Sequence, residues 1–302
     1  MRVVVTGAAG FIGGRLASAL IARGHLDGRP ITELVLVDQA FPDDSTSINI
    51  RRLRGDVRDP RVRQTLFEKP IQAFFHLAAT LTAEAERDFE KGIEVNTVGL
   101  LSLLDDCRKS GHVRFIFSSS MAAFGGQLPD IVHDELPQRP TTSYGVQKVI
   151  AELLLDDYTR RGFLDGRVLR LPVVLLRPTN SAPALSGFIS AIVREPLAGR
   201  PVVCPFDAAT RMPVSSVGGR GTRANQALRD AGWSIGTCAR HQSSGVVSDS
   251  RGDDIFHGTA RAAGCQRPDF LEIRCVFAGP FGRDAEEFYV GSGSEWGNNS
   301  RI

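Results

Sequence analysis

Tyr144 and Lys148 are a pair of residues that can carry out acid–base chemistry together. They open a segment of helical periodicity and are four residues apart, so both lie on one face of the predicted helix. A phenol titrates at about 10 and is a poor base at neutral pH, but a neighbouring ammonium group stabilises the phenolate. A tyrosine in this setting can take a proton from a hydroxyl group while a hydride leaves the same carbon. Because the spacing is also common on surface helices, its meaning depends on the rest of the chain.

Ser118, Ser119 and Ser120 form a run of hydroxyl side chains at the end of a predicted strand. In open parallel sheets, ligands bind at the carboxyl ends of the strands. A serine at this position can hold the oxygen atom that reacts. On the residues alone, any of the three could serve, or they could only cap the strand.

Gly7, Gly10 and Gly13 have the spacing of a phosphate-binding turn. They join the apolar run Arg2–Thr6, a predicted strand, to Phe11–Arg23, whose apolar residues recur at helical spacing. Such glycines allow a tight turn, a close approach of the backbone to a pyrophosphate, and close packing of helix on strand. The phosphates then lie at the amino end of the helix, where free N–H groups favour negative charge. The turn therefore predicts a dinucleotide-binding site.

Two aspartates are candidates for the adenosine half of that dinucleotide. Asp38 ends the predicted strand Leu34–Asp38, where a carboxylate can accept both ribose hydroxyls and would repel a 2′-phosphate. No arginine follows it directly, so the sequence favours NAD over NADP. Asp56, in Gly55–Asp59, can bind the adenine amino group or cap a helix, and its sequence context leaves both roles open.

The elements that position these residues alternate between strand and helix. Uniformly apolar strands that alternate with helices predict an α/β protein with a Rossmann-type doubly wound parallel sheet. We expect an NAD-binding domain over 1–172 and a smaller C-terminal substrate-binding region over 173–302. The predicted strands are Arg2–Thr6, Leu34–Asp38, Ala73–Leu77, Phe115–Ser118 and Val168–Leu171, and the predicted helices are Phe11–Arg23, Pro60–Phe67, Glu84–Lys109 and Tyr144–Arg161.

The composition points away from several classes of protein. The chain has 302 residues, 42% of them hydrophobic, and a formal net charge of +2, so we expect neither a nucleic acid nor a membrane as partner. We expect no secretory signal and no membrane span, because the first residues form a strand and no apolar run is long enough. We also expect no metal site and a reduced, cytoplasmic protein, because the cysteines are odd in number and scattered. They are Cys107, Cys204, Cys238, Cys265 and Cys275.

The character of the sequence changes near Pro213. Only Leu228 and Leu271 are leucines after that point, there is no lysine, and arginine, glycine and serine dominate. Our hypothesis is that the reading frame is shifted after about Ser216, in which case we expect the tail to be partly disordered for lack of apolar residues. The alternative is a divergent but genuine substrate region, in which the alternating stretch Leu271–Phe277 can form a strand.

In its motifs and their order, the chain resembles the NAD-dependent epimerase/dehydratase family of extended short-chain dehydrogenases/reductases. The resemblance covers about the first 180 residues, with its blocks in family order. The matching blocks are Thr6–Gly13, Val37–Asp38, Gly55–Asp59, Phe75–Ala79, Val95–Gly99, Ser118–Gly125 and Tyr144–Lys148.

The resemblance implies roles that the residues alone leave open. Ser120 becomes the catalytic serine beside Tyr144 and Lys148, and Asn96 supports a proton relay through Lys148, which also holds the nicotinamide ribose. A homodimer through the helices Glu84–Lys109 and Tyr144–Arg161 is also implied. The implied cofactor-binding residues are Gly7, Gly10, Phe11, Ile12, Gly13, Asp38, Asp56, Val57, Leu77, Ala78, Ala79, Asn96, Tyr144 and Lys148.

A narrower resemblance to the D-erythronate dehydrogenase group rests on Ser143–Lys148, Glu152–Tyr158, Arg161–Gly166, Leu169–Pro172 and Ser186–Gly199. It implies oxidation of a small sugar acid, D-erythronate, to its 2-oxo form with NAD. Ser120, Tyr144 and Arg177 are then the expected substrate contacts, with Arg194 as a second candidate partner for the carboxylate.

Two other functions stay open. One is a nucleotide-sugar epimerase or dehydratase, although Arg170–Pro178 departs from the segment that such enzymes usually carry. The other is a non-catalytic dinucleotide-binding protein with an impaired C-terminus. The joint presence of Ser120, Tyr144 and Lys148 argues against the second.

Overall fold

The computed structural model describes residues 1–41, 49–129, 132, 135–175 and 189–192, together with the backbone of four short strands farther along the chain. The chain divides into two compact units, one containing Met1–Pro172 and the other beginning at Val173. Each unit has its own sheets, and the residues with candidate chemistry that the structure describes lie in the first.

The first unit contains a six-stranded parallel sheet. Its strands lie in the order β5-β4-β1-β6-β7-β8, so the chain builds outward from β1 in one direction and then returns to build in the other. This order is that of a Rossmann-type fold, in which the direction of strand addition reverses between β1 and β6. The predicted fold class is therefore confirmed. The strands are β1 (Arg2–Thr6), β4 (Glu33–Asp38), β5 (Ile50–Arg54), β6 (Ala73–His76), β7 (Arg114–Ser120) and β8 (Asp165–Leu171), and a two-stranded hairpin is formed by β2 (His25–Leu26) and β3 (Arg29–Pro30).

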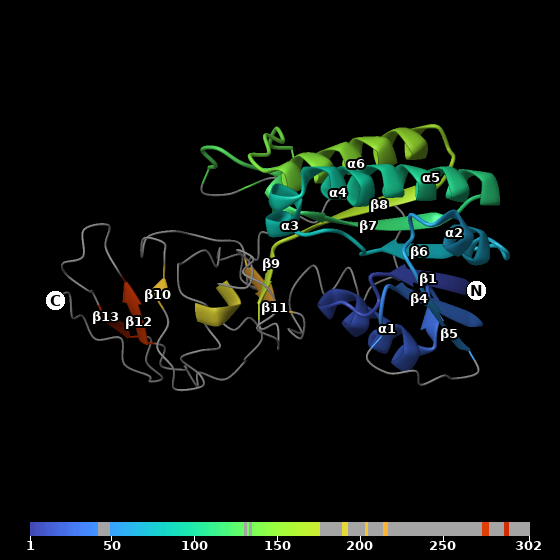
Figure 1. Cartoon of the computed structure of the whole chain (residues 1–302). Helices are drawn as coiled ribbons and strands as arrows, with labels where there is room; N and C mark the ends of the chain where they lie inside the picture. The colour runs from blue at the N-terminus through green and yellow to red at the C-terminus, as the bar shows by residue number, and fades with distance from the viewer. Residues whose placement is uncertain are drawn as a thin grey trace. The chain divides into compact units, whose positions relative to one another are not determined.

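Helices cover both faces of this sheet. Helices α5 and α6 lie side by side on one face, and α1 lies on the other (Figure 1). The helical segments are α1 (Phe11–Arg23), α2 (Pro60–Leu66), α3 (Thr82–Arg87), α4 (Phe89–Ile93), the π-helical turn η1 (Glu94–Val98), α5 (Gly99–Ser110), the 3₁₀ turn η2 (Met121–Ala123) and α6 (Ser143–Arg160).

Alternation along the strands divides the core into two layers. Val4 of β1 packs in the cluster that contains α5 and α6, whereas Val3 and Val5 pack with Leu16 and Leu20 of α1. This is the alternation of a strand that is buried on both faces. The apolar strands of the sequence therefore become the middle layer of the unit.

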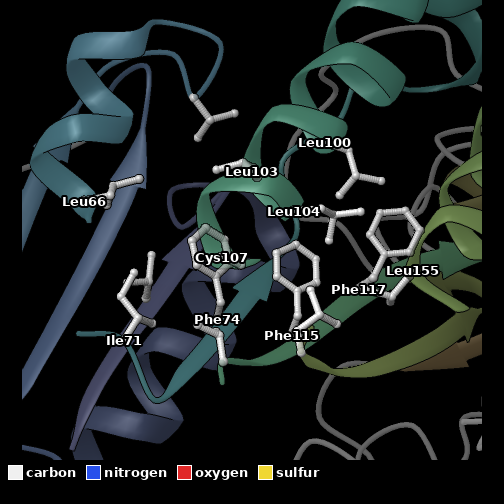
Figure 2. Close-up of a cluster of buried hydrophobic side chains, with 14 of the residues drawn as sticks. Leu66, Ile71, Phe74, Leu100, Leu103, Leu104, Cys107, Phe115, Phe117 and Leu155 are labelled. Atoms are coloured by element: carbon white, nitrogen blue, oxygen red, sulfur yellow. The ribbon is translucent and has the colours of Figure 1, made fainter. Parts of the chain in front are cut away.

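The layer beneath α5 is rich in aromatic side chains. The rings of Phe74 and Phe115, on β6 and β7, stack with centroids 5.1 Å apart. Leu103 and Leu104 of α5 lie over these rings, and Cys107 completes the cluster (Figure 2). Burying a side chain of this size contributes about 1.5–3 kcal/mol, so the cluster holds α5 firmly on the sheet.

Two features differ from the sequence prediction. The prediction of one helix over Glu84–Lys109 is wrong, because the backbone of Asp88 leaves helical geometry (φ −131°, ψ 84°) and its side chain caps α4 at the N–H of Lys91. The π-helical turn η1 then separates α4 from α5. The sequence prediction also lacks β5, whose residues Ile50–Arg54 are mostly charged and half-buried at the edge of the sheet.

In the second unit the structure describes two small groups of strands. One is the parallel pair β9 (Val173–Leu175) and β11 (Val214–Ser216), and the other joins β10 (Val203–Cys204), β12 (Arg274–Phe277) and β13 (Glu287–Tyr289). The predicted strand Leu271–Phe277 contains β12. Arg177 and Arg194 lie outside the described residues, as does most of the segment after Ser216 to which the reading-frame hypothesis applies. Among the described helices, none combines the length and apolar character that a membrane crossing requires.

Candidate active site

Lys148 connects helix α6 to the end of strand β7. Its side chain is 2% exposed, and its Nζ donates a hydrogen bond of 2.7 Å to the backbone oxygen of Ser118. The same Nζ lies 4.5 Å from the ring centroid of Phe117 and 5.3 Å from that of Tyr144. Contacts between a cation and the face of a ring are favourable at these distances. The predicted pair Tyr144 and Lys148 therefore shares a buried setting rather than an exposed helix face.

Burial changes the titration of Lys148. It lowers the pKa of the side chain from 10.5 to about 7, and the negative charge of Glu152 opposes this shift. Burial, together with the positive charge of Lys148, also lowers the pKa of His76 to about 3, so this imidazole is neutral. Its Nδ1 lies 2.8 Å from the hydroxyl oxygen of Thr6. Lys148 thus gives up its proton more readily than an exposed lysine, and it lies beside a histidine that stays uncharged.

A glycine brings Tyr144 and Ser120 into the same region. A Cβ atom on Gly145 would lie 2.1 Å from the backbone oxygen of Ala122, so the first turn of α6 lies directly against η2. Ser120 comes immediately before η2, and its Oγ accepts a hydrogen bond of 3.1 Å from Ala122 N. The hydroxyl hydrogen of Ser120 can still donate to a ligand. Tyr144 directly precedes Gly145 and is almost fully buried.

Asn96 holds the segment after β6 against helix α6. Its Nδ2 donates to the backbone oxygen of Thr80 at 3.1 Å and to Oε1 of Gln147 at 2.7 Å, while its Oδ1 accepts from Thr80 N at 3.0 Å. These bonds bring Asn96 to the residue that precedes Lys148. The side-chain hydrogen bond of Lys148 itself goes to Ser118.

The glycine turn has no room for side chains at two of its three positions. Gly7 has φ +70°, and a Cβ there would lie 2.7 Å from Ala78 N. A Cβ on Gly13 would lie 2.0 Å from the oxygen of Gly7. Gly10 precedes α1, where no side chain caps the helix and no acidic residue occupies the first turn, which begins with Phe11 and Ile12. A phosphate group fits this amino terminus in both charge and hydrogen bonding.

Asp38 lies beside the turn. Its Oδ2 accepts a hydrogen bond of 2.9 Å from Ala9 N, and its Oδ1 accepts one of 2.7 Å from Gln39 N. A carboxylate has about four lone-pair sites, so both oxygens keep capacity for the hydroxyls of a ribose. The glycine turn and Asp38 together fit an NAD molecule.

The side chains of Asp56 and Val57 make more contacts within the protein than the sequence indicates. Oδ2 of Asp56 accepts hydrogen bonds from Arg58 at 2.7 Å and from Gln39 at 3.3 Å, and Arg58 holds the pKa of the carboxyl below its usual value. The side chain of Val57 is buried in the core. An adenine amino group would therefore share the Asp56 carboxylate with Arg58. Leu77, Ala78 and Ala79 are half-buried, and the first two lie against Gly7.

Sequence reasoning missed a buried ion pair beside this site. Glu152 of α6 and Arg170 of β8 are 6% and 3% exposed and are joined by a contact of 2.6 Å. Two signals point to them in the sequence. Glu152 continues the spacing of Tyr144 and Lys148 by one more helical turn, and Arg170 interrupts the otherwise apolar predicted strand Val168–Leu171.

The candidate residues thus come together in two places. Ser120, Tyr144 and Lys148 lie where β7 meets α6, and the glycine turn lies with Asp38 and Leu77–Ala79 at the ends of β1, β4 and β6. Arg177 falls outside the described residues. The described part of the chain contains no cluster of three or more histidine, cysteine, aspartate or glutamate side chains that could hold a metal ion.

Comparison with known proteins identifies relatives of the chain. The sequence model of the NAD-dependent epimerase/dehydratase family matches residues 3–214. A D-erythronate dehydrogenase of Cupriavidus necator is 47% identical over 210 residues, and one of Haemophilus influenzae is 41% identical over 218 residues. These matches cover 68% and 72% of the chain but 65% and 68% of the relatives, so the chain spans about two-thirds of their length.

A solved structure is similar over a comparable part. The nucleoside-diphosphate-sugar epimerase from Agrobacterium tumefaciens shares 38% sequence identity with the chain, with a TM-score of 0.70. The match covers 76% of this chain and 69% of that protein. The part matched by the family model, residues 3–214, includes the glycine turn, Ser120, Tyr144 and Lys148.

Proposed function

The chain belongs to the NAD-dependent epimerase/dehydratase family, and on that basis we propose that it is a dehydrogenase that oxidises a secondary hydroxyl of a small sugar acid with NAD. The proposed substrate is D-erythronate and the product its 2-oxo form. The observation that carries the proposal is the buried contact of Lys148 with Ser118 and with the ring of Tyr144, between the end of β7 and the start of α6. The names of the two relatives above supply the substrate class.

In the proposed mechanism Tyr144 is the base. The ammonium form of Lys148, close to the phenol ring, favours the phenolate and lowers the pKa of Tyr144. Tyr144 then takes the proton of the substrate hydroxyl, and Ser120 donates a hydrogen bond that holds the same oxygen. Bound NAD supplies the acceptor for the hydride. The low exposure of Tyr144 and Lys148 keeps bulk water away from the proton that moves.

The cofactor would be held by residues at the carboxyl ends of β1, β4 and β6. The turn through Gly7, Gly10 and Gly13 would bind the pyrophosphate at the start of α1, and Asp38 would bind the adenosine ribose. Lys148 would hold the nicotinamide ribose, and Arg177 is the proposed partner of the substrate carboxylate.

The alternative with specific support is a nucleotide-sugar epimerase, since the similar solved structure carries that name. The two functions differ in what happens to the cofactor. A dehydrogenase releases one NADH for each substrate that it oxidises, whereas an epimerase keeps its NAD bound and produces no net NADH. A non-catalytic dinucleotide-binding protein would do neither.

The test is a coupled measurement of cofactor and product with the purified chain. With D-erythronate and excess NAD we expect NADH absorbance to rise in proportion to the 2-oxo acid that forms. Interconversion of a nucleotide sugar with no net NADH would favour the epimerase. NAD binding without turnover of either substrate would contradict both enzymatic functions.

We also propose a homodimer through the face formed by α4, η1, α5 and α6. This face carries several large apolar side chains that are exposed in the single chain, which is typical of an interaction surface. They are Phe89, Val98, Leu101, Val146 and Leu153.

A further inference from the structure

The buried Glu152 carboxylate gathers hydrogen bonds from three parts of the fold. Arg170 of β8 donates to it from Nη2 at 2.6 Å and from Nε at 3.1 and 3.2 Å. Gln138, in the segment before α6, donates to Oε2 at 2.7 Å, and the hydroxyl of Ser119 donates to Oε1. The guanidinium of Arg170 also lies 4.9 Å from the ring centroid of Phe124. Glu152 therefore joins β7, β8 and the segment before α6.

The link through Ser119 reaches the candidate catalytic residues on both sides. The backbone oxygen of Ser118 accepts the hydrogen bond of Lys148, and Ser120 carries the hydroxyl proposed to hold the reacting oxygen. Ser119 lies between them and pairs with Arg170 in the register of β7 and β8. The Glu152 carboxylate holds the Ser119 side chain. It therefore also orients the end of β7, where Ser118 and Ser120 lie on either side of Ser119.

Stability alone does not account for this pair. Two buried charges lose hydration, and replacing such a pair by apolar residues of similar volume is often neutral or stabilising. The same sheet joins β7 and β8 at their opposite ends by another ion pair, Arg114 with Asp165, which is more exposed. The more deeply buried of the two pairs is Glu152 with Arg170, and Glu152 lies one helical turn beyond Lys148.

We propose that Glu152, held by Arg170, is a positioning residue that sets the Lys148 ammonium group and the Ser120 hydroxyl for catalysis. The proposal rests on the proposed function for the part that concerns Ser120. The part that concerns Lys148 is a property of the chain itself. Glu152 touches neither the reacting atoms nor the cofactor in this proposal, since it acts through Ser119 and through its charge.

The charged and titratable groups around Lys148 come from three elements. Tyr144 and Glu152 are on α6, His76 is on β6, and Arg170 is on β8. His76 is neutral, and Arg170 is bound to Glu152. Loss of the Glu152 charge therefore removes the anion that favours the ammonium form of Lys148.

The test uses the small number of lysines. The chain has only Lys69, Lys91, Lys109 and Lys148, of which the first three are exposed. NMR of ¹³C-lysine-labelled protein can follow the titration of each, with Lys148→Met identifying the buried signal. In Glu152→Gln we expect the Lys148 midpoint to fall by about one pH unit or more. The matched control, Asp165→Asn, breaks the ion pair at the other end of the same strands and should leave that midpoint unchanged.

A milder variant addresses the positioning of Ser120. Ser119→Ala removes one hydrogen bond to Glu152 and keeps both charges, so it tests geometry in a chain that still folds. We expect kcat to fall several-fold with the KM for NAD unchanged, and the Lys148 midpoint to stay near the wild-type value. Wild-type kcat in Ser119→Ala, or a wild-type Lys148 midpoint in Glu152→Gln, would overturn the proposal. A shifted midpoint in a chain that never produces NADH would instead overturn the proposed function and leave the role of Glu152 toward Lys148 in place.

Discussion

Burying the ammonium group of Lys148 costs free energy, and the cost depends on pH. Its pKa is 10.5 in the unfolded chain and about 7 in the folded one. Between these values the unfolded chain binds more protons, so the Lys148 contribution to the free energy of unfolding rises with pH. We expect this rise to be absent in Lys148→Met. Denaturant unfolding of both proteins at intervals across the window measures the difference, and stability curves that stay parallel would contradict it.

Tyr144 should be indispensable for turnover but not for cofactor binding. Removing its hydroxyl in Tyr144→Phe deletes the proposed base, for which we expect kcat to fall by about 10²–10⁴-fold. The dissociation constant of NAD, measured by fluorescence titration, should change little. Tyr158→Phe is the matched control, because Tyr158 lies on the same helix and packs edge-on against Phe163. Normal turnover in Tyr144→Phe would exclude this residue as the base.

At the scale of the element, the junction of β1 and α1 depends on the absence of one side chain. A Cβ on Gly13 would overlap the oxygen of Gly7 at 2.0 Å, whereas a Cβ on the next residue, Gly14, would meet only ordinary contact at 3.5 Å. We expect Gly13→Ala to lose NAD affinity and stability together, the latter by about 1–3 kcal/mol. Gly14→Ala should be neutral or stabilising by about 0.5–1 kcal/mol, because glycine disfavours a helix interior. Calorimetric NAD titration and thermal unfolding of the two variants check this. Equal behaviour of the two variants would show that the close approach is not what the turn requires.

Local patterns in the sequence predict the elements that local physics determines. Glycine spacing after an apolar run predicts the β1–α1 turn, and the four-residue spacing of Tyr144 and Lys148 predicts a shared helix face that the structure buries. β5 is not predicted, because its pairing with β4 at the edge of the sheet needs no apolar pattern. The break at Asp88 is not predicted either, since it depends on one backbone conformation within a helical pattern.

The partners of a side chain are harder to predict than its position. The ion pair of Glu152 with Arg170 joins residues on different elements, and nothing in the spacing states that β8 brings Arg170 opposite Ser119. The hydrogen bond from Arg58 to Asp56 could be predicted from the sequence, since the two residues are only two positions apart. Side-chain contacts between neighbouring strands can be predicted only once the order of the strands in the sheet is known.

At the scale of the whole molecule, the apolar face of α5 and α6 should determine the oligomeric state. Leu153 is 62% exposed on α6, and a glutamate there would place a charge in the proposed interface. We expect Leu153→Glu to sediment as a monomer where the wild-type chain sediments as a dimer. Ile21→Glu, on the exposed side of α1, is the control and should leave the mass unchanged. A wild-type chain that sediments as a monomer would contradict the dimer.

The end of the family match coincides with the change in composition. The match stops at residue 214, and the leucine-poor segment begins at the same place. We propose that the coding sequence changes frame after about Ser216. Sequencing the gene across the codons for Thr210 to Gly221 and translating all three frames tests this. We expect another frame to restore a leucine-rich pattern, and a tail without such an alternative would establish that the segment is a genuine part of the protein.

The position of β1 in the sheet has a consequence for the order of events during synthesis. β1 is made before both of its neighbours in the sheet, since Val3 pairs with Leu34 of β4 on one side and with Ala73 of β6 on the other. At about 5–20 residues per second, the growing chain must carry this strand, with its three central valines, with one edge unpaired for several seconds. An unpaired apolar edge is a template for association with other chains. Nascent chains that stall before residue 73 should therefore be the ones that most need a chaperone.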